Sequence, residues 1–312
     1  MSSITTNLFQ FNSNRDYPVT VFYIQLGNMF MRSVQWHWHD ELEIDLVRSG
    51  TAVFHIGEKE HVVSAGNAIL LNGHHLHSIT SENPEECEIL SILFHENFLF
   101  DSSESFLYLK YCDGLINNPG FTGIVFSKDT QKGANTIESI QAILNINLVH
   151  AYGYELNTKS HLCHFWMRLL EDEIPAGKGN SLQRDIDEER TKNGILYLQQ
   201  FYAEPLSLEE IAESIHISKS ECCRCFKRSI GISPFEYLMQ YRIFASALKM
   251  QRLAPEAESF STLSQSVGFH NASYYNKIFK KFLKQTPSNY REYIRASHRD
   301  ALSPYGIPFT RI

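Results

Sequence analysis

The chain has 312 residues, about twice the length of a typical domain, so its length predicts two domains. Hydrophobic residues make up 43% of the sequence and charged residues 20%, which excludes a disordered, collagen-like or disulfide-scaffold protein. No stretch approaches the roughly 18 consecutive apolar residues of a membrane span, and the first 30 residues lack the order of a signal peptide. We therefore expect a cytoplasmic protein with no membrane partner, whose six cysteines are reduced thiols.

The net charge of −7 is unevenly distributed along the chain. Residues 1–190 carry 12 basic and 25 acidic side chains, whereas residues 191–300 carry 15 basic and 10 acidic ones. This asymmetry predicts that only the C-terminal part binds a polyanion.

The acidic part begins with short segments rich in β-branched and aromatic residues, separated by glycines at turn-like intervals. They predict strands over residues 18–26, 41–48, 51–57 and 88–94. Because no helical pattern lies between these segments, they favour an antiparallel barrel or sandwich.

Three histidines and a glutamate in the acidic part form a candidate binding site. Strand alternation places His37 and His39 on one face, Glu43 shares their parity, and His77 lies further along the chain. Three imidazoles and a carboxylate can hold a divalent transition metal, and they can also hydrogen-bond a hydroxylated effector such as a sugar. In a third interpretation they line the barrel without a direct role. Residues that suit either the walls of such a pocket or the core are Phe22, Trp36, Trp38 and Phe54.

The pattern changes to helical spacing after about residue 135. Apolar residues recur at this spacing over 137–148 and 162–170, with Gly153 between the runs, which predicts a helical hairpin over residues 135–172. The second run has an apolar stripe that we interpret as a dimer seam; the alternative is a hairpin that packs only on its own barrel. The stripe consists of Leu162, Phe165, Trp166 and Leu169. The polar stretch that follows predicts a linker over residues 173–190.

The basic part contains an internal repeat with an offset of 53 residues and no gap. Its first copy is Phe226-Lys227-Arg228, Ser233-Pro234 and Tyr237, and its second copy is Phe279-Lys280-Lys281, Thr286-Pro287 and Tyr290. One supersecondary unit is therefore used twice.

Each copy is predicted to be a helix-turn-helix with a basic second helix. In the first copy Ser207 can cap a helix over 208–214 and Ser218 can cap the next; the second copy has a helix over 261–266 and restarts near Asn271. A helix over 234–253, about 30 Å long, can hold the two reading helices roughly one turn of DNA apart.

Helical spacing separates a buried face from a reading face in each second helix. The expected core residues are Cys222, Cys225 and Phe226 in the first helix and Tyr275, Ile278 and Phe279 in the second. The expected base-reading set is Ser220, Cys223, Arg224, Ser273, Tyr274, Asn276 and Lys277. The expected phosphate partners are Lys219, Lys227, Lys280 and Lys281. Since successive helical side chains point about 100° apart, the cysteines of Cys222-Cys223-x-Cys225 cannot close a zinc site unaided.

These residues resemble the DNA-binding domain of the AraC/XylS-type bacterial transcription regulators over about residues 190–293. The motifs are Ser207-Leu208…Ile211-Ala212, Ser218…Arg224-x-Phe226-Lys227, Gly231-Ile232-Ser233-Pro234…Tyr237, Arg242-Ile243, Val267-Gly268-Phe269, Ser273…Phe279-Lys280-Lys281 and Thr286-Pro287…Tyr290-Arg291. The chain departs from the family pattern at Cys222, Cys225, Ser246 and Lys284, and we expect somewhat looser packing in the first unit.

The histidine motif resembles the cupin barrel, whose metal-binding members use two histidines, a glutamate and a third histidine. His37, His39, Glu43 and His77 match these positions. The second cupin motif is degenerate, because Asn72 stands at the usual Pro and His74 at a usual Gly. Cupin barrels are also the common sensor domain of AraC-type regulators. The resemblance implies a homodimer formed through the hairpin, contact with RNA polymerase, and activation of sugar-catabolism genes.

The predicted fold is an α+β multidomain protein. It consists of a cupin-like antiparallel β-barrel with an N-terminal arm (1–134), a helical hairpin (135–172), a linker (173–190), an all-α domain with two helix-turn-helix units joined by a long helix (191–295), and a tail (296–312). We expect a transcription regulator, not an enzyme, that senses a small molecule and binds double-stranded promoter DNA. It requires no cofactor, although the cupin pocket can accept a divalent transition metal. The alternatives are a metal-dependent cupin enzyme fused to a DNA-binding domain, and an architectural DNA-binding protein with a vestigial barrel.

Overall fold

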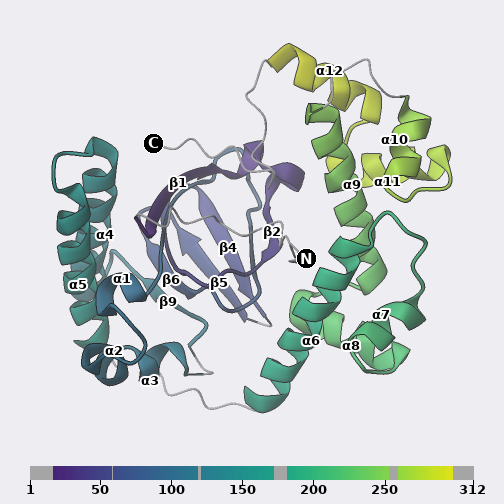
Figure 1. The fold of residues 1–312 in the computed structure, drawn as a ribbon. Coiled ribbons are helices and arrows are strands. Elements are labelled where there is room, and N and C mark those ends of the chain that lie inside the picture. The colour runs from purple at the N-terminus through teal and green to yellow at the C-terminus, as the bar shows by residue number, and fades with distance from the viewer. Residues whose placement is uncertain (1–16, 58, 119–120, 172–180, 253–258, 298–312) are drawn as a thin grey trace. The chain divides into compact units, whose positions relative to one another are not determined.

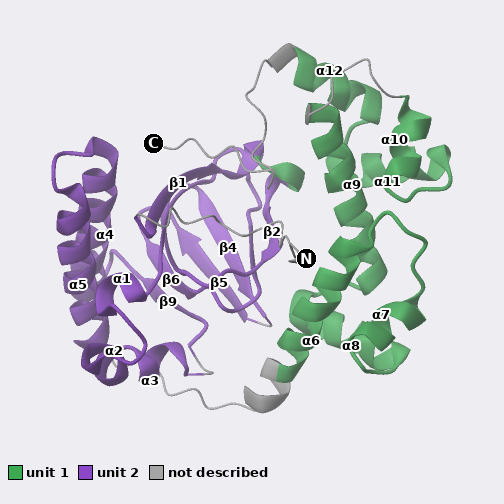
Figure 2. Ribbon diagram, in the orientation of Figure 1, with its two compact units in different colours: residues 1–8, 29–31, 184–308 green, residues 9–28, 32–183, 309–312 purple. Residues whose placement is uncertain are grey.

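The structure is a computed structural model that describes residues 17–57, 59–118, 121–171, 181–252 and 259–297. The chain divides after Gln183 into two compact units, purple and green in Figure 2, and Met29–Met31 are grouped with the green unit. Within the described ranges, no helix combines the length and the apolar character that crossing a membrane requires.

Two antiparallel sheets form the centre of the N-terminal unit (Figure 1). One sheet has the strand order β1 (Val19–Gln25), β8 (Glu88–Phe94), β3 (Leu42–Ser49), β6 (Ala68–Asn72) and β9 (Gly123–Phe126). The other has the order β2 (Val34–His37), β7 (His77–Thr80), β4 (Thr51–Ile56) and β5 (Lys59–Ser64). This jelly-roll-like pair of sheets confirms the predicted antiparallel architecture, and β1, β3, β4 and β8 confirm the four predicted strands.

Strand β3 divides the unit into an apolar side and a polar interior. Leu42, Ile44 and Leu46 belong to the hydrophobic core that the first sheet shares with the helices. Glu43 and Asp45 alternate with them and therefore point to the opposite face, toward the other sheet. Both carboxyl side chains are buried. The alternation of a single strand thus brings two acidic groups between the sheets.

The predicted helical hairpin is confirmed by α4 (Gln131–Val149) and α5 (Tyr154–Glu171). Gly153 lies between them with a φ of +79°, a conformation that glycine adopts without strain. Three short helices after β8 were not predicted. They are α1 (Asn97–Phe100), α2 (Phe106–Tyr111) and α3 (Asp113–Ile116).

The predicted dimer seam on the hairpin is wrong. Leu162, Phe165, Trp166 and Leu169 are at most 3% exposed and belong to the core of their own unit. The indole Nε1 of Trp166 also donates a hydrogen bond of 3.0 Å to the carbonyl oxygen of Tyr111, at the end of α2. Helical spacing showed correctly that these side chains share a face, but it does not reveal what covers that face.

The predicted linker is also partly wrong. Residues 181–190 form the first half of α6 (Ser181–Gln200), and residues 172–180 lie outside the described residues. The segment was interpreted as a linker because it is polar, but polar side chains can also belong to the buried face of a helix, as Asp187 and Thr191 do in α6.

The C-terminal unit confirms both helix-turn-helix motifs. The first is α7 (Leu208–Ser214) and α8 (Lys219–Ile230), and the second is α10 (Phe260–Ser266) and α11 (Ala272–Leu283). Ser207, Ser218, Ser259 and Asn271 cap these helices through side-chain hydrogen bonds. The connecting helix α9 (Pro234–Arg252) has 19 residues, or about 28 Å at 1.5 Å per residue, and α12 (Pro287–Ser297) follows the second motif.

The repeat extends to buried hydrogen bonds. Gln199 on α6 donates to the hydroxyl of Tyr237 over 2.8 Å, and Gln251 on α9 donates to that of Tyr290 over 3.0 Å. The two tyrosines are the equivalent residues of the 53-residue repeat. Helix α9 is therefore bonded to α12 in the way that α6 is bonded to α9.

Arg242 on α9 connects the two motifs. Its Nε and Nη2 donate hydrogen bonds of 2.7 Å to the carbonyl oxygens of Tyr202 and Glu204, in the segment before α7. Its guanidinium also lies 5.8 Å from the ring centre of Phe269, in the turn of the second motif. Burial lowers the pKa of Arg242, because the charged form loses its hydration. One cation thus contacts both halves of the repeat.

The equivalent C-caps of α8 and α11 generate a stability prediction. Gly231 and Lys284 both adopt the left-handed conformation, with φ of 72° and 58°. Because a Cβ is strained there, we expect Lys284→Gly to stabilise the C-terminal unit and Gly231→Ala to destabilise it, each by about 1 kcal/mol. Urea unfolding should be followed by far-ultraviolet circular dichroism.

Tryptophan fluorescence is the control, because all three tryptophans lie before residue 184. The fluorescence transition should be the same in both variants. Equal circular-dichroism midpoints for Lys284→Gly and the parent chain would show that the cap carries no strain.

Candidate metal centre and nucleic-acid interface

Four buried residues of the N-terminal unit converge on one point between the sheets. His37 ends β2, His39 follows it in a loop, Glu43 lies on β3, and His77 begins β7. One ligand atom from each residue lies within 4.8 Å of the others, and none of the residues is more than 5% exposed. The structure therefore brings together all four residues of the candidate site, from both sheets.

The backbone orients all three imidazole rings in the same way. The Nδ1 atoms of His37, His39 and His77 lie 2.8, 3.0 and 2.8 Å from backbone carbonyl oxygens two residues away. Because a carbonyl only accepts hydrogen bonds, each Nδ1 carries a proton, and each Nε2 of a neutral ring presents a lone pair. Histidine ligands of metal ions are oriented in this way by their second nitrogen.

The lone pairs face a carboxylate. Oε2 of Glu43 lies 3.2 Å from Nε2 of His39 and 3.3 Å from Nε2 of His77. Two acceptors that face each other need a positive charge between them, which is either a proton on an imidazole or a metal ion. Protonation of His37 is disfavoured, because burial and then the charges of His77 and His39 lower its pKa well below the ordinary value. The donor set therefore fits a cation.

A second buried carboxyl group lies beside Glu43. Asp45 is fully buried and accepts a hydrogen bond from the hydroxyl of Ser91 on β8. Burial, and then the charge of Glu43, raise the pKa of Asp45 well above its usual range. Burial also raises the pKa of Glu43, but the neighbouring His39 and His77 outweigh it and lower this pKa well below its usual range. The two shifts favour the protonated form of Asp45 and the ionised form of Glu43. Sequence reasoning missed Asp45, although it has the same strand parity as Glu43.

Gly73 allows the loop before β7 to approach His39. A Cβ at this position would lie 2.0 Å from the carbonyl oxygen of Glu41 and 2.4 Å from Nδ1 of His39. Asn72, at the degenerate position of the motif, donates a hydrogen bond of 3.0 Å to the carbonyl oxygen of Ile116. Asn72, which stands where the cupin motif usually has Pro, therefore connects the loop before β7 to the end of α3.

The apolar residues proposed as walls of this site divide into two groups. Phe54 on β4 and Phe22 on β1 are buried, at 1% and 9% exposed. Trp36 and Trp38 are half-buried, and alternation along β2 places Trp36 on the face opposite to His37. Trp36 therefore lies away from the histidine cluster, and its ring centre is 6.3 Å from that of His55 on β4.

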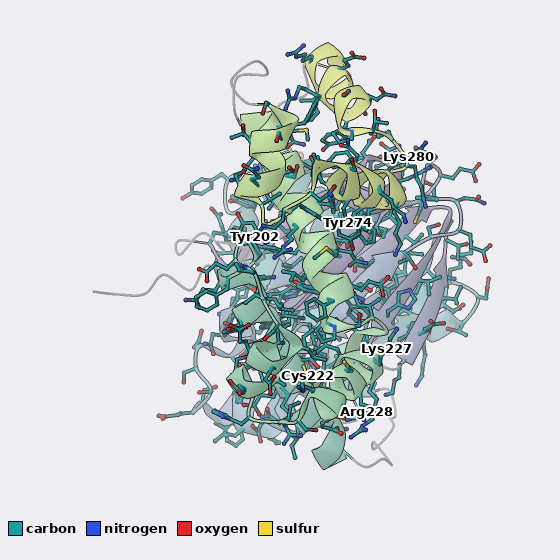
Figure 3. All side chains as sticks on the ribbon, turned by 90° about the vertical axis from the view of Figure 1, so that its right-hand side faces the viewer. Tyr202, Cys222, Lys227, Arg228, Tyr274 and Lys280 are labelled. Carbon is teal, nitrogen blue, oxygen red and sulfur yellow. The ribbon has the colours of Figure 1, made fainter. Side chains whose placement is uncertain are left out.

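The faces predicted for the reading helices are confirmed by burial. Cys222, Cys225 and Phe226 on α8, and Tyr275, Ile278 and Phe279 on α11, are at most 9% exposed. The exposed members of the predicted DNA-binding set are Ser220, Arg224, Lys227, Ser273, Tyr274, Asn276, Lys277 and Lys280, and Cys223 is partly exposed. Lys227 on α8, and Tyr274 and Lys280 on α11, are on the same side of the unit in Figure 3.

Two of the three cysteines of α8 belong to the core. Cys222 and Cys225 are fully buried, and burial raises the pKa of both thiols, which keeps them protonated. The Sγ of Cys225 lies 3.0 Å from the carbonyl oxygen of Asp187 on α6 and donates to it. Ser246, another departure from the family pattern, lies 2.6 Å from the hydroxyl of Tyr275 and is hydrogen-bonded to it.

Comparison with known proteins places these two sites in known domains. Residues 29–140 match the model of the AraC-like ligand binding domain, and residues 211–293 match that of a helix-turn-helix domain. The chain is 26% identical over 291 residues to YdeC of Bacillus subtilis, described as an uncharacterised HTH-type transcriptional regulator. That match covers 93% of this chain and 97% of YdeC.

Two further relatives have more specific names. The lactose operon transcription activator of Staphylococcus xylosus is 26% identical over 184 residues, covering 56% of this chain and 61% of the activator. The transcriptional activator RhaS of Escherichia fergusonii is 23% identical over 261 residues, covering 82% and 87%. A crystal structure of ToxT from Vibrio cholerae is 14% identical, with a TM-score of 0.44, over 88% of this chain and 96% of that one.

The two domains define the class of protein. A chain with a ligand-binding domain followed by two helix-turn-helix motifs is a DNA-binding transcription regulator that has a domain for a small molecule. The chain belongs to the AraC family of transcription regulators.

The buried carboxyl pair generates a prediction. Asp45→Asn keeps an acceptor for Ser91 and a donor for Glu43 without an ionisable group, so it should be tolerated, whereas Asp45→Ala should cost about 1–3 kcal/mol. Because the folded chain holds this proton above the unfolded pKa, Asp45 destabilises the parent increasingly as the pH rises above about 4. The stability of Asp45→Asn relative to the parent should therefore increase between pH 4 and pH 7.

The measurement is urea unfolding followed by tryptophan fluorescence with a chelator present. A stability difference between Asp45→Asn and the parent that does not change with pH would show that Asp45 is ionised in the folded chain.

Proposed function

We propose that the C-terminal unit reads promoter DNA with α8 and α11 in successive major grooves. The observation that carries this proposal is the pair of equivalent helices, each with a buried apolar face and an exposed polar face, joined by α9. Arg224 and Lys277 are equivalent residues of the repeat, and their side chains suit guanine edges. Lys227 and Lys280 are better suited to phosphate contacts.

For the N-terminal unit we propose a divalent transition metal ion held by His37, His39, Glu43 and His77. The close contacts of Glu43 with His39 and His77, at 3.2 and 3.3 Å, favour a single ion between these ligand atoms, because a sugar ring does not fit between them. Ligands at about 2.1 Å from one ion lie up to about 4.2 Å apart, so a small contraction of the cluster suffices. Imidazole and carboxylate ligands suit zinc, nickel, iron or copper.

When bound, the ion would supply a positive charge that neutralises Glu43 and offers a coordination position to an anionic or hydroxylated effector. The name of the lactose operon activator supports a sugar as the effector, and both named activators support activation of transcription. We propose a sensory rather than catalytic role for the cluster, because the matched relatives are named regulators. RNA polymerase is the proposed partner at the promoter.

We also propose that the chain forms a homodimer through the outer face of α5. Opposite to the buried face, Leu156, Met167 and Leu170 are 78%, 59% and 37% exposed, and Cys163 is exposed among them. With Ser160 they have the alternating spacing of three and four residues of a coiled-coil seam. The stripe is centred on Cys163, so a two-fold contact brings this residue close to its copy.

The DNA proposal predicts position-specific effects. On a selected binding sequence, Arg224→Ala should cost roughly 1–3 kcal/mol and relax the preference at one cluster of base pairs, and Lys277→Ala should relax another cluster about one helical turn away. Lys227→Ala should weaken binding to all DNA sequences nearly alike. It should also reduce the slope of log affinity against log salt concentration by about one unit.

The measurement is the affinity of each variant for DNAs with single base-pair changes, at several salt concentrations. A uniform loss for Arg224→Ala and Lys277→Ala would make them phosphate contacts instead.

The metal proposal predicts that the purified chain binds one equivalent of Co²⁺ or Zn²⁺ per subunit. His39→Ala and Glu43→Gln should weaken this binding by roughly 100-fold or more, because each removes a ligand. Visible absorption of Co²⁺ and metal analysis after dialysis measure the binding.

His55→Ala is the matched control for these variants. His55 lies on β4 outside the cluster and contacts Thr80 and Glu60 instead. If the chelator-treated chain binds no divalent ion, yet is stabilised by a sugar, the interpretation as an effector pocket without metal replaces this one.

The dimer proposal predicts that mild oxidation links two chains through Cys163. Disulfide formation requires Cβ atoms about 3.5–4.5 Å apart, so it reports a direct approach. Met167→Glu should leave the chain monomeric in light scattering and prevent the cross-link. Cys163→Ser should abolish the cross-link, whereas Cys223→Ser should not. A parent chain that is monomeric at tens of micromolar would exclude the seam.

A further inference from the structure

A chain of ion pairs connects α6 to the predicted base-reading arginine of α8. Oδ2 of Asp187 accepts a hydrogen bond of 2.7 Å from Nε of Arg228, whose Nη2 donates to Oε1 of Glu221 over 2.6 Å. The other carboxylate oxygen of Glu221, Oε2, accepts from Nε and Nη2 of Arg224 over 2.9 and 2.5 Å. Figure 3 labels Arg228, the cation between Asp187 and Glu221.

The contact with Glu221 selects one edge of the Arg224 guanidinium. Nε and one N–H of Nη2 are used by the carboxylate, and Nη1 and the outer N–H of Nη2 remain. These are the two parallel donors with which an arginine binds O6 and N7 of guanine. Glu221 therefore leaves the guanine-binding edge available while it holds the inner edge.

The two ends of this chain of ion pairs differ most in burial, and its two middle members are partly exposed. The Asp187 side chain is 6% exposed, those of Glu221 and Arg228 are 26% and 37% exposed, and that of Arg224 is 61% exposed. Exposed ion pairs of this kind contribute little to folding stability. Their main physical effect is to restrict a long side chain, which otherwise loses its rotamer freedom only on binding DNA.

We propose that Glu221 positions Arg224 for base reading, and that Asp187 holds Glu221 through Arg228, so that α6 determines the orientation of the reading side chain. This inference rests on the proposed role of Arg224 in DNA binding. It assigns a specificity-determining function to three residues that are not expected to contact the base themselves.

The second motif provides an internal comparison, because the repeat does not reproduce this chain. The residue equivalent to Glu221 is Tyr274, and those equivalent to Arg224 and Arg228 are Lys277 and Lys281. Lys281 lies 3.6 Å from Glu236 on α9 instead. Variants of the ion-pair chain should therefore affect only the base pairs that the first motif reads.

The experiment begins with a binding sequence selected by the full-length parent chain from random double-stranded DNA. Affinities for this sequence and for every single base-pair change are then measured for the parent and for Arg224→Ala, Glu221→Gln and Asp187→Asn. Thermal melting followed by circular dichroism shows whether each variant is folded. Since Asp187 is buried, Glu221→Gln at the surface is the decisive variant.

We expect Arg224→Ala to lower discrimination at its base pairs by about 5- to 150-fold. Glu221→Gln should lower discrimination at the same base pairs by about 3- to 10-fold, and Asp187→Asn should act in the same direction. Discrimination at the base pairs read by Lys277 should be unchanged in both.

Glu209→Gln is the matched charge control. Glu209 is an exposed glutamate on α7 that pairs with Lys219 at 3.2 Å, so its substitution removes the same charge without touching Arg224. Both Gln variants should bind all DNA somewhat more tightly at low salt, but only Glu221→Gln should change the ratio between bases.

Two outcomes would overturn the inference while Arg224 remains a reading residue. In one, Glu221→Gln changes the affinity for all DNA sequences by the same factor, as Glu209→Gln does. In the other, Glu221→Gln lowers discrimination further in a chain that already carries Arg224→Ala, which would mean that Glu221 contacts a base directly. If Arg224→Ala itself shows no position-specific effect, the proposed role of Arg224 fails first, and the inference fails with it.

Discussion

Every polar group that this chain buries needs a partner, and this constraint organises both units. Between the sheets, backbone carbonyl oxygens accept hydrogen bonds from Nδ1 of His37, His39 and His77. These bonds direct the three Nε2 lone pairs toward Glu43. In the helical unit, Arg242 donates hydrogen bonds to two backbone carbonyl oxygens and lies against the ring of Phe269, and these contacts connect the two motifs. The bonds that satisfy buried polar groups thus also orient the histidine ligands and connect the two motifs.

The two units use charge in different ways. The N-terminal unit buries two carboxyl groups whose pKa values are shifted in opposite directions, downward for Glu43 and upward for Asp45. The C-terminal unit keeps its charges near the surface, where pairing orients side chains more than it stabilises the fold. Glu221, between Arg224 and Arg228, is the clearest case.

The local pattern of the chain predicts secondary structure best where a physical signal is confined to a few residues. Ser207 and Ser218 predict helix starts because a cap needs only its own side chain and the following backbone amides. The same approach fails for residues 181–190, where polar composition does not distinguish a linker from α6. It also misses β7, whose four residues become a strand by pairing with β2 and β4.

The sequence by itself determined the family, the repeat, the buried and exposed faces of α8 and α11, and the four residues of the histidine cluster. Only the tertiary structure decided what those faces contact. It showed that Leu162, Phe165, Trp166 and Leu169 belong to the core and that Asp45 is buried beside Glu43. It also showed that Asp187 is connected to Arg224 through Arg228 and Glu221. The physical reason is that periodicity records which side chains share a face, whereas pairing and protonation depend on residues that are far apart in the chain.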